Sequence, residues 1–218
     1  MQKTYINQIF TGKAQILPGG HASGIFKQAV AGPVTLTREG IVGDVQADRR
    51  FHGGVDKAVH HYAAENYALL QEYFPEIETS FVPGSIGENI STNGWDEATV
   101  CIGDVFQIGA CKVQVSQPRA PCWKINARYG MEDISRFVEE RGIAGWYYRV
   151  TQTGVMQAGD EFALIERNPD PISVREFWRV FLLPRPELKE LERIGATPGL
   201  NSEMRDKINQ RLDWLSKN

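Results

Sequence analysis

The stretch TVCIGDVFQIGACKVQVS, residues 99–116, carries the clearest signal of fold class in the chain. Short apolar runs with interspersed polar residues lie on both sides of Gly109-Ala110, a pattern typical of half-buried strands. A short glycine-containing connection between two such runs predicts a hairpin over residues 108–112. This stretch therefore predicts antiparallel β-structure.

Similar runs, broken by Gly and Pro, occur from Gln2 to about Asn168, for example over 24–30, 32–37 and 159–166. Runs of this length with turn residues between them are typical of a barrel or sandwich. Apolar residues at helical spacing predict two helices, over 56–74 and over 131–141. The texture predicts a mainly β domain with interspersed helices over residues 1–168.

The texture changes after Asn168, where Asn-Pro-Asp-Pro reads as a rigid linker. Ser173 and Glu176 have the spacing of a capping box, which predicts a helix through about Leu183. Two further helices are expected over 187–194 and 202–214. Residues 169–218 therefore predict a small three-helix appendage that needs to pack on the larger domain for stability.

Composition excludes several classes of function. The 218 residues carry a formal net charge of −3, which argues against a global electrostatic grip on nucleic acid. The chain contains no run of about 18 apolar residues, so no membrane span is expected. The first residues lack the pattern of a secretory signal. Three cysteines, an odd and sparse number, favour reduced thiols. We expect a cytoplasmic protein.

The segment Gln117-Pro-Arg-Ala-Pro-Cys122-Trp-Lys is the first candidate site. Its cysteine stands between proline and tryptophan just past a predicted strand, and the cations Arg119 and Lys124 are close in sequence. Positive charge near a thiol favours the thiolate, the form that binds a soft metal or attacks an electrophile. The alternative is that Cys122 packs as a small apolar residue. Cys101 and Cys111 lie inside strand-like runs, which predicts core packing for both.

Two further segments combine small and polar residues. Residues 43–62 contain the pair Gly53-Gly54 together with His52, Lys57 and His60. Glycines before a helix can expose backbone N–H groups to an anion, although a surface turn with solvated charges remains open. Residues 83–90, which include Glu88 and Asn89, either approach a ligand or form a plain loop that leads into a strand.

These segments, in this order, resemble the MOSC family, named for the C-terminal domain of molybdenum cofactor sulfurase, and are most similar to its bacterial YiiM-like branch. Any one motif is unspecific, whereas the ordered set is specific. The residues that carry the resemblance are Gly43-Asp44, Phe51-His-Gly-Gly-Val-Asp-Lys-Ala-Val-His60-His-Tyr, Gly87-Glu-Asn-Ile, Gly103-Asp104 and Gln117-Pro-Arg-Ala-Pro-Cys122. One departure is Val55, where many relatives have proline.

The resemblance implies a β-barrel that holds a molybdenum cofactor, a metal bound to a molybdopterin, in a cleft. It implies that Cys122 is the molybdenum ligand and the catalytic residue. It also implies that a set of mostly polar or cationic residues holds the pterin and its phosphate. That set is His52, Gly53, Gly54, Lys57, His60, Asn89, Arg119 and Arg149.

The resemblance further implies an oxidoreductase that reduces small N-hydroxylated compounds, of the hydroxylaminopurine or amidoxime type, to amines or amidines. The sequence shows no flavin, haem or iron–sulfur motif, and no use of pyridoxal phosphate is expected. Electrons are therefore expected from a separate reductase. Neither a nucleic acid nor a membrane is expected as a partner.

Two other classes of function remain open from the sequence. One is a carrier that binds the cofactor, or a persulfide on Cys122, without redox turnover. The other is hydrolysis, with Cys122 as nucleophile and His52 or His60 as base. A zinc site is not favoured, because the chain has no paired Cys-x-x-Cys or His-x-x-x-His spacing.

Overall fold

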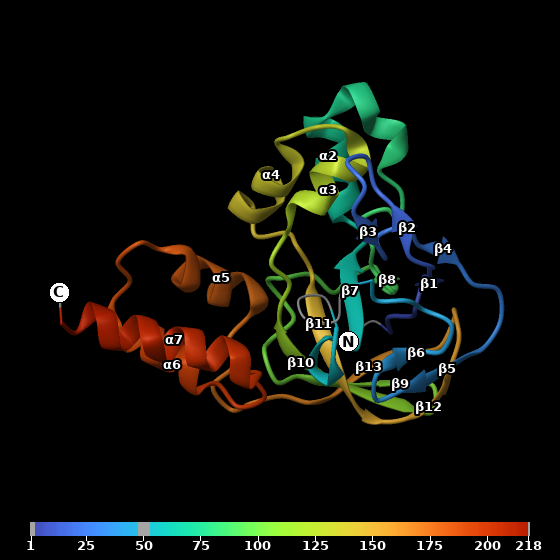
Figure 1. The fold of residues 1–218 in the computed structure, drawn as a ribbon. Helices are drawn as coiled ribbons and strands as arrows, with labels where there is room; N and C mark the ends of the chain where they lie inside the picture. The colour runs from blue at the N-terminus through green and yellow to red at the C-terminus, as the bar shows by residue number, and fades with distance from the viewer. Residues whose placement is uncertain (1–2, 48–52, 218) are drawn as a thin grey trace.

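The protein, described here from a computed structural model over residues 3–47 and 53–217, is built around one large twisted sheet with two groups of helices beside it (Figure 1). Among the described residues, this sheet has eight strands in the order β13-β9-β10-β11-β7-β8-β1-β4. The strands are β1 (Gln8–Thr11), β4 (Gln28–Ala29), β7 (Val59–Ala63), β8 (Ile90–Thr92), β9 (Val105–Ile108), β10 (Cys111–Pro118), β11 (Trp146–Gln152) and β13 (Phe162–Glu166).

Neighbouring strands of this sheet are antiparallel except for β7 and β8, which run parallel. The hairpin predicted over residues 108–112 is confirmed: Cys111 lies opposite Ile108 at its closed end. The turn contains Gly109, whose φ of 53° falls in the left-handed region that glycine adopts readily. Strand β10 has a further role, since it leads directly to Cys122.

The prediction of one helix over 56–74 is wrong in its first half. Residues Val59–Ala63 form β7, between β11 and β8, and all five are buried. Because both faces of a central strand are covered, its sequence lacks polar–apolar alternation and resembles a buried helix. The segment instead comprises one 3₁₀ turn, η1 (Val55–Lys57), then β7, then α2 (Asn66–Tyr73).

Two smaller sheets complete the β-structure in the described residues. Strands β12 (Gly154–Met156), β5 (Val34–Thr37) and β6 (Gly40–Ile41) form one, and β2 (Gln15–Ile16) and β3 (Ala22–Ser23) form the other. No pairing among the described strands joins the two edges of the large sheet, β13 and β4. The predicted mainly β barrel is therefore confirmed only in a coarser form, as a mixed sheet accompanied by helices.

A second hydrophobic core lies under the first group of helices. This group comprises α2, the 3₁₀ segment η2 (Pro75–Ser80), α3 (Trp123–Tyr129) and α4 (Ile134–Glu140). The predicted helix over 131–141 is confirmed as α4, with Gly142 at φ 63° after its end. Helix α3 is not predicted by the sequence analysis, and it matters most here because Cys122 is its N-cap residue.

The three predicted C-terminal helices are confirmed as α5 (Val174–Leu182), α6 (Leu188–Ala196) and α7 (Ser202–Leu215). The Ser173 hydroxyl accepts a hydrogen bond from the Glu176 backbone N–H at 3.0 Å, as the capping pattern predicts. Their apolar faces share one core cluster with the large sheet: Phe177 and Ile208 belong to the same cluster as Val113. The division into a domain of residues 1–168 and an appendage of residues 169–218 stays a prediction.

The helices of the described chain are short, and the longest, α7, has 14 residues. None of them combines the length and the apolar character that crossing a bilayer requires.

Candidate functional site

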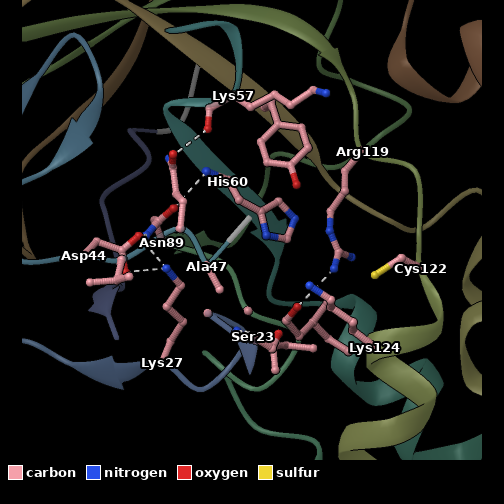
Figure 2. A pocket seen from close by; sticks show the side chains of 17 residues that line it. Ser23, Lys27, Asp44, Ala47, Lys57, His60, Asn89, Arg119, Cys122 and Lys124 are labelled. Atoms are coloured by element: carbon pink, nitrogen blue, oxygen red, sulfur yellow. Dashed lines mark hydrogen bonds and ion pairs between the residues drawn. The ribbon is translucent and has the colours of Figure 1, made fainter. Parts of the chain in front are cut away.

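The candidate site is a cavity of about 590 Å³, including its open mouth, between the large sheet, the β2–β3 hairpin and α3. Figure 2 shows polar side chains from all three regions pointing into it. The cavity is lined by Ser23, Gly24, Ile25, Lys27, Asp44, Val45, Gln46, Ala47, Lys57, His60, Ile86, Gly87, Asn89, Arg119, Cys122, Lys124 and Tyr147.

Cys122 lies at the junction of β10 and α3 and lines this cavity. It is a free cysteine of intermediate exposure, whereas Cys101 and Cys111 are buried. Burial raises the pKa of the Cys101 thiol to about 11 and also raises the pKa of Cys111. Core packing is thus confirmed for these two, and the cavity holds the accessible thiol.

Arg119 is buried beside the thiol, with only 7 % of its surface exposed. Its backbone N–H donates to Gly145 O at 3.0 Å, which fixes the loop. Its Nη2 donates to Ile86 O at 3.3 Å, but Nη1 has no hydrogen-bond partner among the described residues. A buried donor of this kind costs free energy unless a ligand satisfies it. Arg119 therefore offers an unused, charged donor to whatever occupies the cavity.

His60 lies on β7 under the cavity, and its ring Nε2 is 3.3 Å from Ala144 O. Burial, assisted by the charge of Arg119, holds the pKa of His60 well below its usual value. The ring is therefore neutral at neutral pH, with Nε2–H donating to Ala144 O. The Asn89 side chain accepts from the His60 backbone N–H at 3.1 Å. This pair joins β7 to the loop that precedes β8.

A buried ion pair, Lys27 with Asp44, forms another wall of the cavity. Asp44 also accepts from Gly12 N at 2.8 Å and from Asn89 Nδ2 at 2.9 Å. Burial lowers the pKa of Lys27, and the Asp44 charge opposes that shift. Since Asp44 is held from three directions, it fixes the position of the ammonium group at the cavity wall.

Five of the predicted site residues are brought together in this cavity: Lys57, His60, Asn89, Arg119 and Cys122. Gly53 and Gly54 are not among its lining residues; they precede the single turn η1, so the expected long helix behind them is absent. The prediction for His52 lies outside the described residues.

Arg149 also stands apart from the cavity lining. Its guanidinium pairs with Asp56 at 2.6 Å and donates to Gln114 at 3.0 Å and to Gly199 O at 2.9 Å. These contacts link β11 and β10 to the turn before α7, which gives Arg149 a structural role in this fold.

Ser23, Lys27, Asp44 and Tyr147 also line the cavity, although none of them is among the predicted site residues. Lys27 lies inside an apolar run that predicts a strand. A single cation in such a run is unusual, and this could have indicated a functional role for Lys27. Asp44 belongs to the motif Gly43-Asp44 that carries the resemblance. Tyr147 lies on β11 between Trp146 and Tyr148. Of these three residues Tyr147 lines the cavity, whereas Trp146 and Tyr148 belong to the main core.

The lining suits an anionic ligand, because the described residues contribute four cationic side chains, Lys27, Lys57, Arg119 and Lys124, and one carboxylate, Asp44. Within residues 3–47 and 53–217, no group of three His, Cys, Asp or Glu side chains converges as a metal site. The protein thus offers one thiol and several donors. That donor set fits an anionic organic cofactor that brings most of the ligands of its own metal.

Comparison with known proteins gives a consistent result. A family model described as "MOSC domain" matches residues 48–163. "Protein YiiM" of Escherichia coli (strain K12) is 40 % identical over 172 residues, which cover 79 % of this chain and 76 % of that protein. A protein of Gibberella moniliformis named "Reductase" is 36 % identical over 169 residues, which cover 77 % of this chain and 30 % of that longer protein.

Solved structures show the same relationship. The crystal structure of YiiM from Escherichia coli superposes with a TM-score of 0.83 at 30 % identity, covering 100 % of this chain and 95 % of that one. The crystal structure of YiiM from Geobacillus stearothermophilus gives 0.82 at 29 % identity, covering 96 % and 99 %. The similarity therefore includes the C-terminal helices as well as the sheet.

Proposed function

The chain belongs to the MOSC domain family, in its YiiM-like branch. From that premise we propose that the protein holds a molybdenum cofactor in its cavity and reduces small N-hydroxylated compounds. The substrates are of the hydroxylaminopurine or amidoxime type, and the products are amines or amidines. The similarity to a protein named "Reductase" supports an oxidoreductase. We further propose that the protein is soluble and cytoplasmic and that a separate reductase supplies its electrons.

The observation that carries the proposal is the free Cys122 thiol in one cavity with the unpartnered Nη1 of buried Arg119. Figure 2 shows the Cys122 sulfur and the Arg119 guanidinium facing the same space. A thiolate is a soft ligand suited to a metal, and a guanidinium donates in a fixed fork that suits phosphate. The pair fits the two ends of a metal-bearing, phosphorylated cofactor.

Each remaining residue has a task in binding. Lys57, Lys124 and Lys27 supply positive potential for the phosphate, and Asp44 keeps Lys27 in place. Asn89 and neutral His60 hold the wall of the cavity rigid without adding charge. His52, Gly53, Gly54 and Arg149 are retained as candidates for contacts to the cofactor, and Arg149 also has contacts within the fold.

The overall reaction balances as a reduction: the N–O bond of the substrate takes up two electrons and two protons, and an N–H bond and water form. The cofactor, when bound, supplies the metal that exchanges those electrons with the substrate. The protein's own part would be to hold the cofactor through Cys122 and Arg119, to orient the substrate and to exclude bulk water from the cavity floor.

The first experiment measures molybdenum and pterin in protein purified from a cofactor-producing host. We expect near-stoichiometric metal in the wild type and in Cys101→Ala, and its loss in Cys122→Ala with the fold retained by circular dichroism. The holoprotein should then reduce benzamidoxime with reduced methyl viologen as electron donor. Absence of molybdenum from the wild type in a competent host would overturn the proposal.

Two other outcomes point to the alternatives. Bound cofactor without turnover on any N-hydroxylated compound would favour a carrier, for which the partial exposure of Cys122 is suitable. Metal-independent ester cleavage that alkylation of Cys122 abolishes would favour hydrolysis with His60 as base.

A further inference from the structure

Tyr147, a lining residue of the cavity, lies between two other lining residues in the large sheet. On β11 it is directly opposite His60 of β7 and Gln117 of β10. The register continues just past the end of β10, where the Arg119 backbone N–H donates to Gly145 O at 3.0 Å. Arg119 is thus the diagonal neighbour of Tyr147, a spacing that a long side chain can bridge.

The alternation along β11 and β7 shows which side chains share the cavity face of the sheet. Trp146 and Tyr148 belong to the main core, whereas Tyr147 between them lines the cavity. On β7, His60 lines the cavity, while the ring of His61 contacts the Tyr148 hydroxyl at 3.0 Å. Successive residues of a strand point to opposite faces, so Tyr147 and His60 meet on the cavity side.

The Tyr147 ring is held firmly on this face. Only 9 % of the residue is exposed. Its ring lies against the His60 ring, with 5.3 Å between centroids and an interplanar angle of 46°. The His60 ring is itself fixed by its bond to Ala144 O. The position of the Tyr147 hydroxyl is therefore set by the sheet before any ligand arrives.

This hydroxyl contacts the guanidinium of Arg119. Burial raises the pKa of Tyr147, while the charge of Arg119 and a hydrogen-bonding contact between the two side chains oppose that shift. A guanidinium has only donors, so the hydroxyl oxygen is the acceptor in this contact. The other contact that holds the guanidinium is the long bond from Nη2 to Ile86 O. Nη1 has no hydrogen-bond partner in the described chain.

We propose that Tyr147 is a positioning residue, whose hydroxyl holds the Arg119 guanidinium so that Nη1 is presented to the cavity, and that it thereby sets the affinity of the cavity for a phosphate-type anion. A long side chain loses rotamer freedom when it binds a ligand, and a contact that already orients it reduces this cost. The inference rests on the proposed function in one respect, namely that Arg119 binds the anionic group of the cofactor.

The test uses pyrophosphate as the probe and the full chain purified without cofactor. Calorimetry at low salt compares wild type with Tyr147→Phe, which removes only the hydroxyl. We expect binding to weaken about threefold to tenfold, the effect of about one hydrogen bond. Proton–nitrogen NMR of the same proteins follows the Arg119 Nε–H signal, which is assigned by its absence from Arg119→Met. In Tyr147→Phe this signal should shift and its hydrogen exchange should become faster.

Tyr148→Phe is the matched control, because it removes the hydroxyl of the next residue on the same strand, from the opposite face of the sheet. It should leave both the pyrophosphate affinity and the Arg119 signal unchanged. Unchanged affinity in Tyr147→Phe would overturn the positioning role, and so would weaker binding with an unchanged Arg119 signal.

Two further outcomes separate this inference from the proposed function. If wild type binds no pyrophosphate, the positioning role and the assignment of Arg119 to the phosphate both fail. If Tyr147→Phe behaves as expected but wild type from a cofactor-producing host contains no molybdenum, the positioning role stands and the proposed function fails.

Discussion

Lys57 Nζ lies 3.0 Å from Glu203 Oε2, so an ion pair joins the wall of the cavity to the first turn of α7. The Lys57 side chain is 10 % exposed and that of Glu203 is 53 % exposed. Close by, the Asn201 backbone N–H donates to Ser116 O at 2.9 Å. The C-terminal helices therefore contribute to the electrostatics of the site as well as to the main core.

Glu203→Gln tests this contribution. Glu203 neutralises part of the charge of Lys57, so its removal raises the positive potential of the cavity. We expect pyrophosphate, as a probe anion, to bind about two- to fivefold more tightly to the apoprotein, the range of an exposed ion pair. Calorimetry at low and high salt measures this, and the gain should shrink as salt is added.

Glu190→Gln is the control for that experiment, since Glu190 pairs with Arg179 inside the same helical unit at 2.8 Å and has no part in the cavity lining. It should leave pyrophosphate affinity unchanged. Weaker binding in Glu203→Gln would contradict the prediction and would mean that Glu203 chiefly holds Lys57 in its binding position.

Arg119→Met separates binding from stability. The buried Nη1 has no partner in the described chain, so replacement by an apolar side chain of similar length relieves a desolvation cost and loses the long bond to Ile86 O and the contact with the Tyr147 hydroxyl. We expect the urea midpoint of the apoprotein to stay the same or rise, while molybdenum retention is lost. Urea denaturation and metal analysis of the same preparation measure both.

Arg128→Met provides the contrast for Arg119. Arg128 donates to Ile25 O and lies 5.1 Å from the centroid of the Phe26 ring, without lining the cavity. This variant should lower the urea midpoint and keep its molybdenum. If Arg119→Met instead keeps its metal, or is destabilised as much as Arg128→Met, the assignment of Arg119 to the cofactor is wrong.

The fold was predictable from sequence where local signals suffice. Helix α5 has a Ser173–Glu176 cap and an amphipathic face, and the β9–β10 hairpin has alternation around a glycine turn. Strand β7 was not predictable, because it is buried by β11 and β8, which are distant from it in sequence. Helix α3 has seven residues and follows a proline-rich loop, so its periodicity is too short to detect.

The candidate site divides in the same way. Cys122 and Arg119 were predictable because they share one motif, which the resemblance to a family made specific. The pair of Lys27 with Asp44 was not, since it depends on two loops 17 residues apart in sequence that meet only in the folded chain. Arg149 was assigned to the site through the resemblance, whereas the contacts that the structure gives it are to Asp56, Gln114 and Gly199 O.

Glu97→Gln tests a buried carboxyl group that supports the site. Glu97 accepts from Gly145 N at 2.8 Å and from Asn66 Nδ2 at 3.1 Å, and burial raises its pKa to about 6. The folded state thus binds this proton more tightly than the unfolded state does. The stabilisation that protonated Glu97 gives to the folded state is fully present below the pKa of this carboxyl group in the unfolded chain. It is lost as the pH rises through about 6.

A pKa raised from the ordinary value of 4.5 to about 6 corresponds to about 2 kcal/mol. The free energy of unfolding of Glu97→Gln relative to wild type should therefore rise by about this amount between pH 4.5 and pH 7. Urea denaturation across this range measures the difference, in which the contributions of His60 and His61 cancel. Parallel pH curves for the two proteins would contradict the prediction.

Gly145→Ala tests the crowded point where these contacts meet. A Cβ at Gly145 would lie 2.1 Å from the backbone oxygen of His61, and its φ of 79° is unfavourable for alanine. The same residue donates to Glu97 and accepts from the Arg119 backbone N–H. We expect a loss of more than about 3 kcal/mol of stability, because a backbone clash adds to strain, together with loss of cofactor retention.

Gly130→Ala is the matched control: its φ is 68°, but nothing lies within 4 Å of an added Cβ. This control isolates the strain and should cost about 1–2 kcal/mol with metal retained, so equal urea midpoints for the two variants would show that the contact with β7 is not restrictive.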